Sequence, residues 1–65
     1  NPVSSTLQVN RVQDVLEIKI INITGLIVRT VRNTSTVDVA DLKEGLYLIQ
    51  VKTPSGVYTT NFIKQ

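Results

Sequence analysis

The sequence predicts a small all-β domain built as an antiparallel β-sandwich. The chain has 65 residues, 42% of them hydrophobic, which suits one small globular core. Val, Ile and Thr dominate the composition, and these β-branched residues pack well on the pleated surface of a sheet. Apolar residues also recur at every second position in several segments. This is the period of a half-buried strand.

The N-terminal half begins with a short strand over residues 5–10, in which apolar and polar residues alternate. A loop at 11–14 follows. The next strand is stronger, because one of its faces is entirely apolar. The residues on that face are Leu16, Ile18 and Ile20. The segment 22–25 ends in Gly25, which predicts a tight turn with a positive φ angle.

A third strand is expected over residues 26–31, with Ile27 and Val31 on the same face. A polar loop separates it from a brief fourth strand that contains Val37 and Val39. Both strands are short, as is usual in sandwiches with frequent turns.

The C-terminal half contains the clearest pattern. Residues 40–45 form either a single helical turn or a crossing loop that ends at Gly45. A fifth strand follows, a hairpin turn at 53–56 contains Pro and Gly, and a last strand covers 57–64. The inward positions of the fifth strand are Tyr47, Ile49 and Val51.

We therefore expect an immunoglobulin-like sandwich of about six or seven short strands, with residues 1–65 forming a single domain. The core should contain the inward residues of the two strongest strands and of the last strand. These are Leu16, Ile18, Ile20, Tyr47, Ile49, Val51 and Phe62. The opposite faces of these strands carry Ile21, Leu46 and Leu48. Such residues indicate either a contact surface or a second face covered by loops.

The composition argues against several kinds of chemistry. With no His and no Cys, the chain has no histidine base, disulfide or thiolate metal site. Asp38, Asp41 and Glu44 are close in sequence but lack the spacing of a calcium loop. We expect Asp41 to cap the turn at 42–44 instead. No enzyme activity, cofactor or metal is therefore predicted.

The distribution of charge and the lengths of the apolar runs argue against nucleic-acid binding and against a membrane span. Seven Lys and Arg are scattered among five Asp and Glu, whereas a nucleic-acid surface needs clustered positive charge. No apolar run approaches the roughly 20 residues of a membrane span. The chain starts at Asn1 with no Met and no signal peptide, so we expect a piece excised from a longer secreted protein.

Four ordered segments resemble a known family. They are Asn1-Pro2 before the first strand, the strand–turn–strand unit at 16–28, the stretch at 37–47 and the closing strand at 56–65. The third is the most distinctive, since it reads "aspartate, leucine, two residues, glycine, any, tyrosine" before a core strand. Its residues are Asp41, Leu42, Gly45 and Tyr47. In this order and spacing the chain resembles the C-terminal sorting domain of the type IX secretion system, the type A family of Bacteroidetes.

The resemblance implies a non-catalytic signal that directs a cargo protein across the outer membrane. The implied partners are the type IX translocon with its associated outer-membrane proteins and a C-terminal signal peptidase that cleaves many such tails after export. Self-association is a separate expectation, which rests on the apolar residues Ile21, Leu46 and Leu48. The implied location is the cell surface or the medium, reached through the periplasm.

The resemblance also selects recognition candidates, which lie in the distinctive stretch and in the closing strand. They are Asp41, Leu42, Gly45, Tyr47, Phe62, Ile63, Lys64 and Gln65. Gly25 and Gly56 are assigned to structural turns. The family often has a basic residue in the closing strand where this chain has Asn61, which leaves Lys64 as the only charge near that end.

A second hypothesis is an accessory carbohydrate-binding or adhesion module of a secreted enzyme or adhesin. Sugar-binding faces usually present exposed aromatic rings. Only Tyr58 is a credible exposed ring in this sequence, so the sorting domain is the preferred interpretation.

Overall fold

Seven strands form two sheets in the computed structural model, which describes residues 2–3, 5–9 and 14–65. Asn1, Ser4, Asn10 and the 11–13 part of the expected first loop lie outside the described residues. The strands are β1 (Pro2–Val3), β2 (Thr6–Gln8), β3 (Glu17–Ile21), β4 (Ile27–Arg32), β5 (Thr36–Asp38), β6 (Gly45–Thr53) and β7 (Gly56–Lys64). The described part contains no helix. The predicted all-β class is confirmed.

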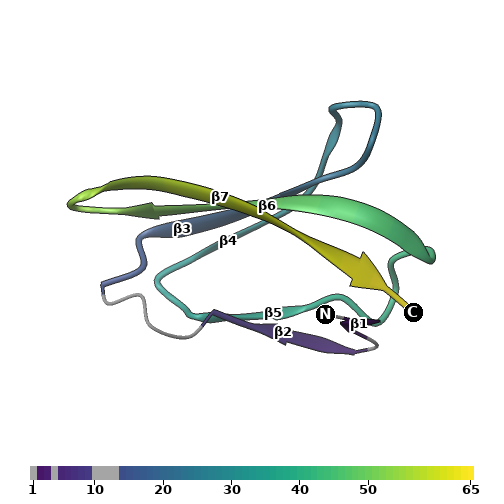
Figure 1. The fold of residues 1–65 in the computed structure, drawn as a ribbon. Coiled ribbons are helices and arrows are strands. Elements are labelled where there is room, and N and C mark those ends of the chain that lie inside the picture. Colours follow the sequence, from purple (N-terminus) through teal and green to yellow (C-terminus); the bar gives the residue numbers. More distant parts are fainter. Residues whose placement is uncertain (1, 4, 10–13) are drawn as a thin grey trace.

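The larger sheet has the strand order β1-β7-β6-β3-β4, and the smaller one pairs β2 with β5. Neighbouring strands are antiparallel except β1, which runs parallel to β7. The small sheet lies beneath only part of the large one (Figure 1). We call the face of the large sheet toward β2 and β5 its inner face, and the opposite face its outer face.

The core lies between the two sheets. Its buried members are Ile18 and Ile20 of β3, Tyr47, Ile49 and Val51 of β6, Phe62 of β7, and Val37 and Val39 in and after β5. The alternation in β3 and β6 places the apolar set on one face, as predicted. Val37 and Val39 were not predicted in the core. They are buried because β5 faces the large sheet.

The prediction for Leu16 was wrong, since its side chain is 41% exposed. Leu16 precedes β3, but its backbone is bonded on both sides: its N–H donates to the Lys52 carbonyl and its carbonyl accepts from Asn33. The small sheet does not extend over this end of the large sheet (Figure 1). Leu16 therefore has the right backbone position, but no strand of the described small sheet lies over it.

The face assignment in the third predicted strand was also wrong. The β3–β4 register shifts between Ile20 and Ile21, so Ile20 lies opposite Arg29 and Ile21 opposite Ile27. Val28 is the extra residue of this bulge. Val28 packs against the core together with Val31, while Ile27 is 50% exposed.

The two expected glycine turns are confirmed. Gly25 has φ +91°, and the Asn22 side-chain oxygen accepts from the backbone N–H groups of Thr24 and Leu26 at 3.0 Å each. At the second turn, Thr53 lies opposite Gly56, which has φ +145°. Residues 40–45 form a crossing loop, with one turn-like bond from the Leu42 N–H to the Val39 carbonyl.

Candidate functional site

The distinctive Asp-Leu-x-x-Gly-x-Tyr stretch anchors the entry into β6. The ring of Tyr47 is buried and stacks on that of Phe62, with centroids 5.5 Å apart and 19° between the planes. Its hydroxyl donates to the Lys43 carbonyl oxygen at 2.7 Å. Leu42 is half-buried and packs against the core. These residues hold the crossing loop against the sandwich and present little surface to a partner.

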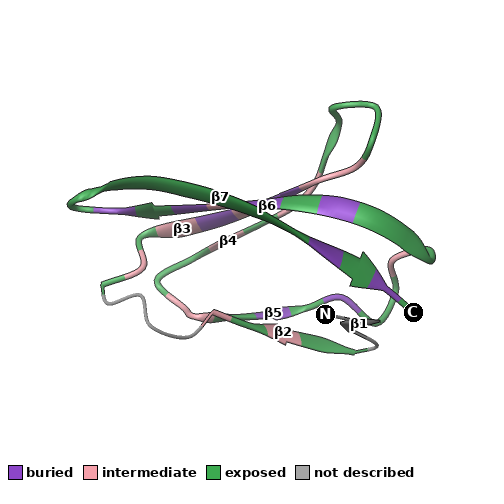
Figure 2. Ribbon diagram, in the orientation of Figure 1, coloured by how far each residue is buried: buried purple, intermediate pink, exposed green. Residues whose placement is uncertain are grey.

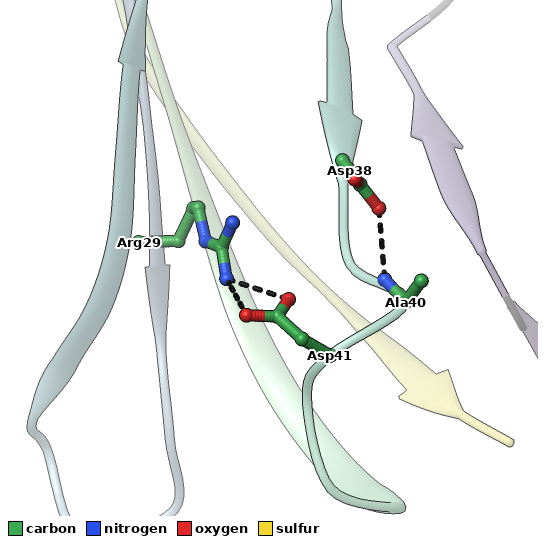
Figure 3. A network of polar contacts seen from close by, with 4 residues as sticks. All are labelled: Arg29, Asp38, Ala40 and Asp41. Atoms are coloured by element: carbon green, nitrogen blue, oxygen red, sulfur yellow. Dashed lines mark hydrogen bonds and ion pairs between the residues drawn. The ribbon is translucent and has the colours of Figure 1, made fainter.

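Asp41 joins the crossing loop to the far edge of the large sheet (Figure 3). One terminal nitrogen of Arg29 in β4 donates to both Asp41 carboxylate oxygens at 2.7 Å. The prediction that Asp41 caps the following turn was therefore wrong. The local bond comes from Asp38, whose carboxylate accepts from the Ala40 N–H at 3.0 Å. The hydrogen bond from Arg29 is the main reason that the pKa of Asp41 lies below its ordinary value.

Lys64 was expected to present a terminal charge, but its side chain is only 6% exposed. The cause is its register, since Lys64 lies two residues after Phe62 and so shares the inner face. It also lies between β1 and β6, opposite Val3 and Gly45. Its ammonium nitrogen donates to the Gln65 carbonyl oxygen at 3.0 Å. Gln65 itself is exposed.

The outer face of the large sheet has an exposed aliphatic half, which we call the outer patch. Its members are Ile21, Ile27, Leu46, Leu48 and Ile63. Cross-strand pairs join them, with Ile21 opposite both Ile27 and Leu48, and Leu46 opposite Ile63. Ile21 is half-buried and the other four are 42–50% exposed. Exposed aliphatic residues that cluster in this way often mark a contact site.

The turn between β3 and β4 extends the outer patch. Ile23 is 78% exposed and Leu26 is 64% exposed. An open hollow of about 290 Å³ lies between this turn and β6, lined by Ile23, Gly25, Leu46 and Leu48 among others. A protruding apolar side chain of a partner fits such a hollow.

The other half of the outer face is charged. Glu17 accepts from the Arg32 guanidinium at 3.1 Å and lies 3.6 Å from the Lys19 ammonium, and Lys52 lies opposite Glu17. The hydrogen bond from Arg32 is the largest cause of the lowered pKa of Glu17. The outer face is therefore divided into an aliphatic half and a largely charged half, which also carries the exposed Val57 opposite Lys52.

The predicted recognition candidates do not form one exposed site. Ile63 belongs to the outer patch, and Gln65 is exposed nearby on the chain. Of the other six, Tyr47, Phe62 and Lys64 are buried, Leu42 is half-buried, and Asp41 and Gly45 are exposed at the crossing loop. The sequence did point to Ile21, Leu46 and Leu48. It missed Ile27, whose face depends on the bulge.

Among the described residues, no three acidic side chains lie close enough together to hold a metal ion. The same part of the chain has no helix that is both long and apolar enough to cross a bilayer.

Comparison with known proteins places the chain in a family. Residues 1–65 match the secretion system C-terminal sorting domain, and the match covers the whole chain. No curated protein and no solved structure gives a significant match. The matched family is non-catalytic in general, and its members carry a signal for export to the cell surface or the extracellular space. The chain belongs to the family of type IX secretion system C-terminal sorting domains.

Proposed function

We propose that this chain is the non-catalytic tail of a longer exported protein and that it directs this cargo through the outer membrane. The observation that carries the proposal is the family match over residues 1–65. The cargo then reaches the cell surface or the medium, and a signal peptidase removes the tail after export. Residues 1–65 act as one folded unit in this role.

We further propose that the translocon, or an outer-membrane protein associated with it, contacts the outer patch. Fully burying a Leu or Ile side chain contributes about 1.5–3 kcal/mol. Ile27, Leu46, Leu48 and Ile63 are each about half exposed, so covering them together supports a specific contact. The strands that carry them are paired with one another, which limits the entropy lost on binding. A second copy of the domain could use the same patch, so recognition and self-association would compete.

Carbohydrate binding has less support. Tyr47 and Phe62 are buried in the core, which leaves Tyr58, at 51% exposure, as the single exposed ring. One ring is a poor stacking platform for a sugar chain.

A transplant experiment tests the proposed function. Residues 1–65 are fused behind an unrelated periplasmic reporter in a host with type IX machinery, and the reporter is measured at the surface, in the medium and in the periplasm. We expect export of the fusion and periplasmic retention of the reporter alone. A strain lacking the translocon is the matched control and should retain both. Retention of the fusion in the complete host, with the domain folded, would contradict the proposal.

A further inference from the structure

The edge of β7 is unpaired over most of its length. On the side away from β6, β7 pairs within the described residues only with β1, and only at Ile63 and Lys64. The preceding stretch, 57–61, therefore offers alternate backbone N–H and C=O groups with no strand beside them.

Within residues 57–61, this free edge lacks the charges, prolines and bulges that protect the edges of natural sheets. Residues 57–61 read Val-Tyr-Thr-Thr-Asn, with no charge, no Pro and strong β-propensity. The opposite edge, β4, carries Arg29 and Arg32 as well as a bulge. Charges and bulges are the usual means of blocking edge-to-edge pairing. A further strand beside residues 57–61 would account for this contrast.

An apolar groove lies below the same edge. The inner-facing residues Tyr58 and Thr60 are exposed, whereas Phe62 farther along the strand is 3% exposed. Figure 2 shows this change along β7, from exposed near the hairpin to buried near the C-terminal end. The groove measures about 260 Å³. Its apolar lining comes from Leu7, Val9, Ile49, Val51, Tyr58 and Phe62.

The groove suits side chains of a strand better than a free ligand. Small-molecule pockets usually measure about 300–1,000 Å³, and this groove is smaller and opens along a strand edge. A strand added to an edge supplies backbone hydrogen bonds, and its alternate side chains enter pockets on one face.

The direction of β1 identifies the occupant. Because β1 runs parallel to β7, with Pro2 opposite Ile63, each residue before Pro2 falls one position earlier on β7. Counting back, the third residue before Pro2 falls opposite Thr60 and the fifth falls opposite Tyr58. Both positions share the inner face of the sheet, above the groove.

We propose that the polypeptide that precedes Asn1 in the full-length protein lies along the free edge of β7, parallel to it and in the register that β1 sets. Its third and fifth residues before Pro2 place their side chains in the groove. This inference rests on the proposed function, in which the domain follows a cargo. It makes the end of the linker part of the folded domain rather than a flexible tether. An enzyme that cuts the linker within this segment must first peel it from the sheet.

A cross-link in the full-length protein tests the position of the segment. Thr60→Cys is combined with a Cys at the third residue before Pro2, and the protein is oxidised mildly. Neighbouring strands lie about 4.7–4.9 Å apart, within the Cα separation of about 4.4–6.8 Å that a disulfide spans. We expect an intramolecular disulfide, identified by mass spectrometry of the digest. Thr30→Cys, on the exposed edge strand β4, is the matched control and should give none.

Three results would overturn the inference. These are no disulfide with Thr60→Cys, equal yields with Thr30→Cys, or a disulfide only between two molecules, which would place a second copy on the edge. Export of the same variants is measured in parallel. Normal export without the intramolecular disulfide would reject the added strand and leave the sorting function standing.

Amide exchange provides a second readout. Two consecutive prolines at the third and fourth residues before Pro2 remove backbone donors of the added strand. We expect exchange of the edge-facing amides in 57–61 to accelerate by about fivefold or more, as loss of one net hydrogen bond implies. Prolines at the twelfth and thirteenth residues before Pro2 lie beyond Gly56, which falls opposite the seventh, and should change nothing. Equal exchange in the two variants would also overturn the inference.

Discussion

Replacing Ile49 with Ala tests the core most severely. Ile49 is 3% exposed and lies in the middle of the large sheet, between Ile20 of β3 and Thr60 of β7. The change removes three buried carbon groups, and at about 0.8 kcal/mol each they account for about 2.4 kcal/mol. The cavity left behind adds a further cost, so the total should be about 3–4 kcal/mol. A 65-residue domain has a total stability of about 3–10 kcal/mol, so this variant should lose at least about a third of the stability of the domain.

Urea unfolding of purified residues 1–65, followed by circular dichroism, measures this loss. Leu48→Ala is the matched control, because Leu48 is adjacent on β6 but points to the outer face and is 42% exposed. It should cost about 1 kcal/mol. If Ile49→Ala costs no more than Leu48→Ala, the assignment of inner and outer faces is refuted.

Three further substitutions test a hydrogen bond, a turn and an ion pair of the fold. Tyr47→Phe removes the hydrogen bond to the Lys43 carbonyl and should lower the free energy of unfolding by about 0.5–1.5 kcal/mol. An unchanged urea midpoint would show that this bond does not contribute to stability. Gly25→Ala meets no atom within 4 Å but must adopt φ +91°, so backbone strain should cost about 1–2 kcal/mol in the same assay, and a cost near zero would contradict the turn geometry. The pKa of Asp41 is lower in the folded protein than in the unfolded chain because of Arg29. Its pair therefore stabilises the fold above about pH 4 and is lost as the pH falls below that. Asp41→Asn should flatten this part of the acid unfolding profile, and an identical profile would contradict the pairing.

The sequence predicted those features that depend on alternation within one strand. The period of two in β3 and β6 identified Ile18, Ile20, Ile49 and Val51 as core residues, because successive side chains of a strand point to opposite faces. Leu16 has the same period but lies beyond the small sheet. The extent of a covering sheet is a tertiary property that periodicity does not contain.

The remaining differences have similar causes. The bulge in β4 moved Ile27 to the outer face, and only the β3–β4 register reveals this shift. Lys64 was named a recognition candidate as the only charge near the C-terminal end, although its position two residues after Phe62 favours the buried inner face. Long Lys side chains can bury their aliphatic stems, so the period was the better guide.

Only part of the outer patch could be predicted from the sequence, for the same reason. Leu46 and Leu48 were recognisable as apolar residues on the outward positions of a strand. Their grouping with Ile63 and Ile27 depends on how strands far apart in sequence are paired. The charged and aliphatic halves of the outer face likewise emerge only when four strands are placed side by side.

The central claim is that the secretion machinery recognises the outer patch, and export of Leu48→Lys measures it most directly. Thr59→Lys is the control, because Thr59 is exposed on the same face but lies opposite Gln50, outside the outer patch. Both variants are fused to the periplasmic reporter, and thermal melts confirm that both are folded. A charge in an apolar contact should cost at least the 1.4 kcal/mol that corresponds to about a tenfold loss of affinity. We expect export of Leu48→Lys to fall by about that factor and export of Thr59→Lys to match the unmodified domain. Equal export of the two folded variants would contradict the claim.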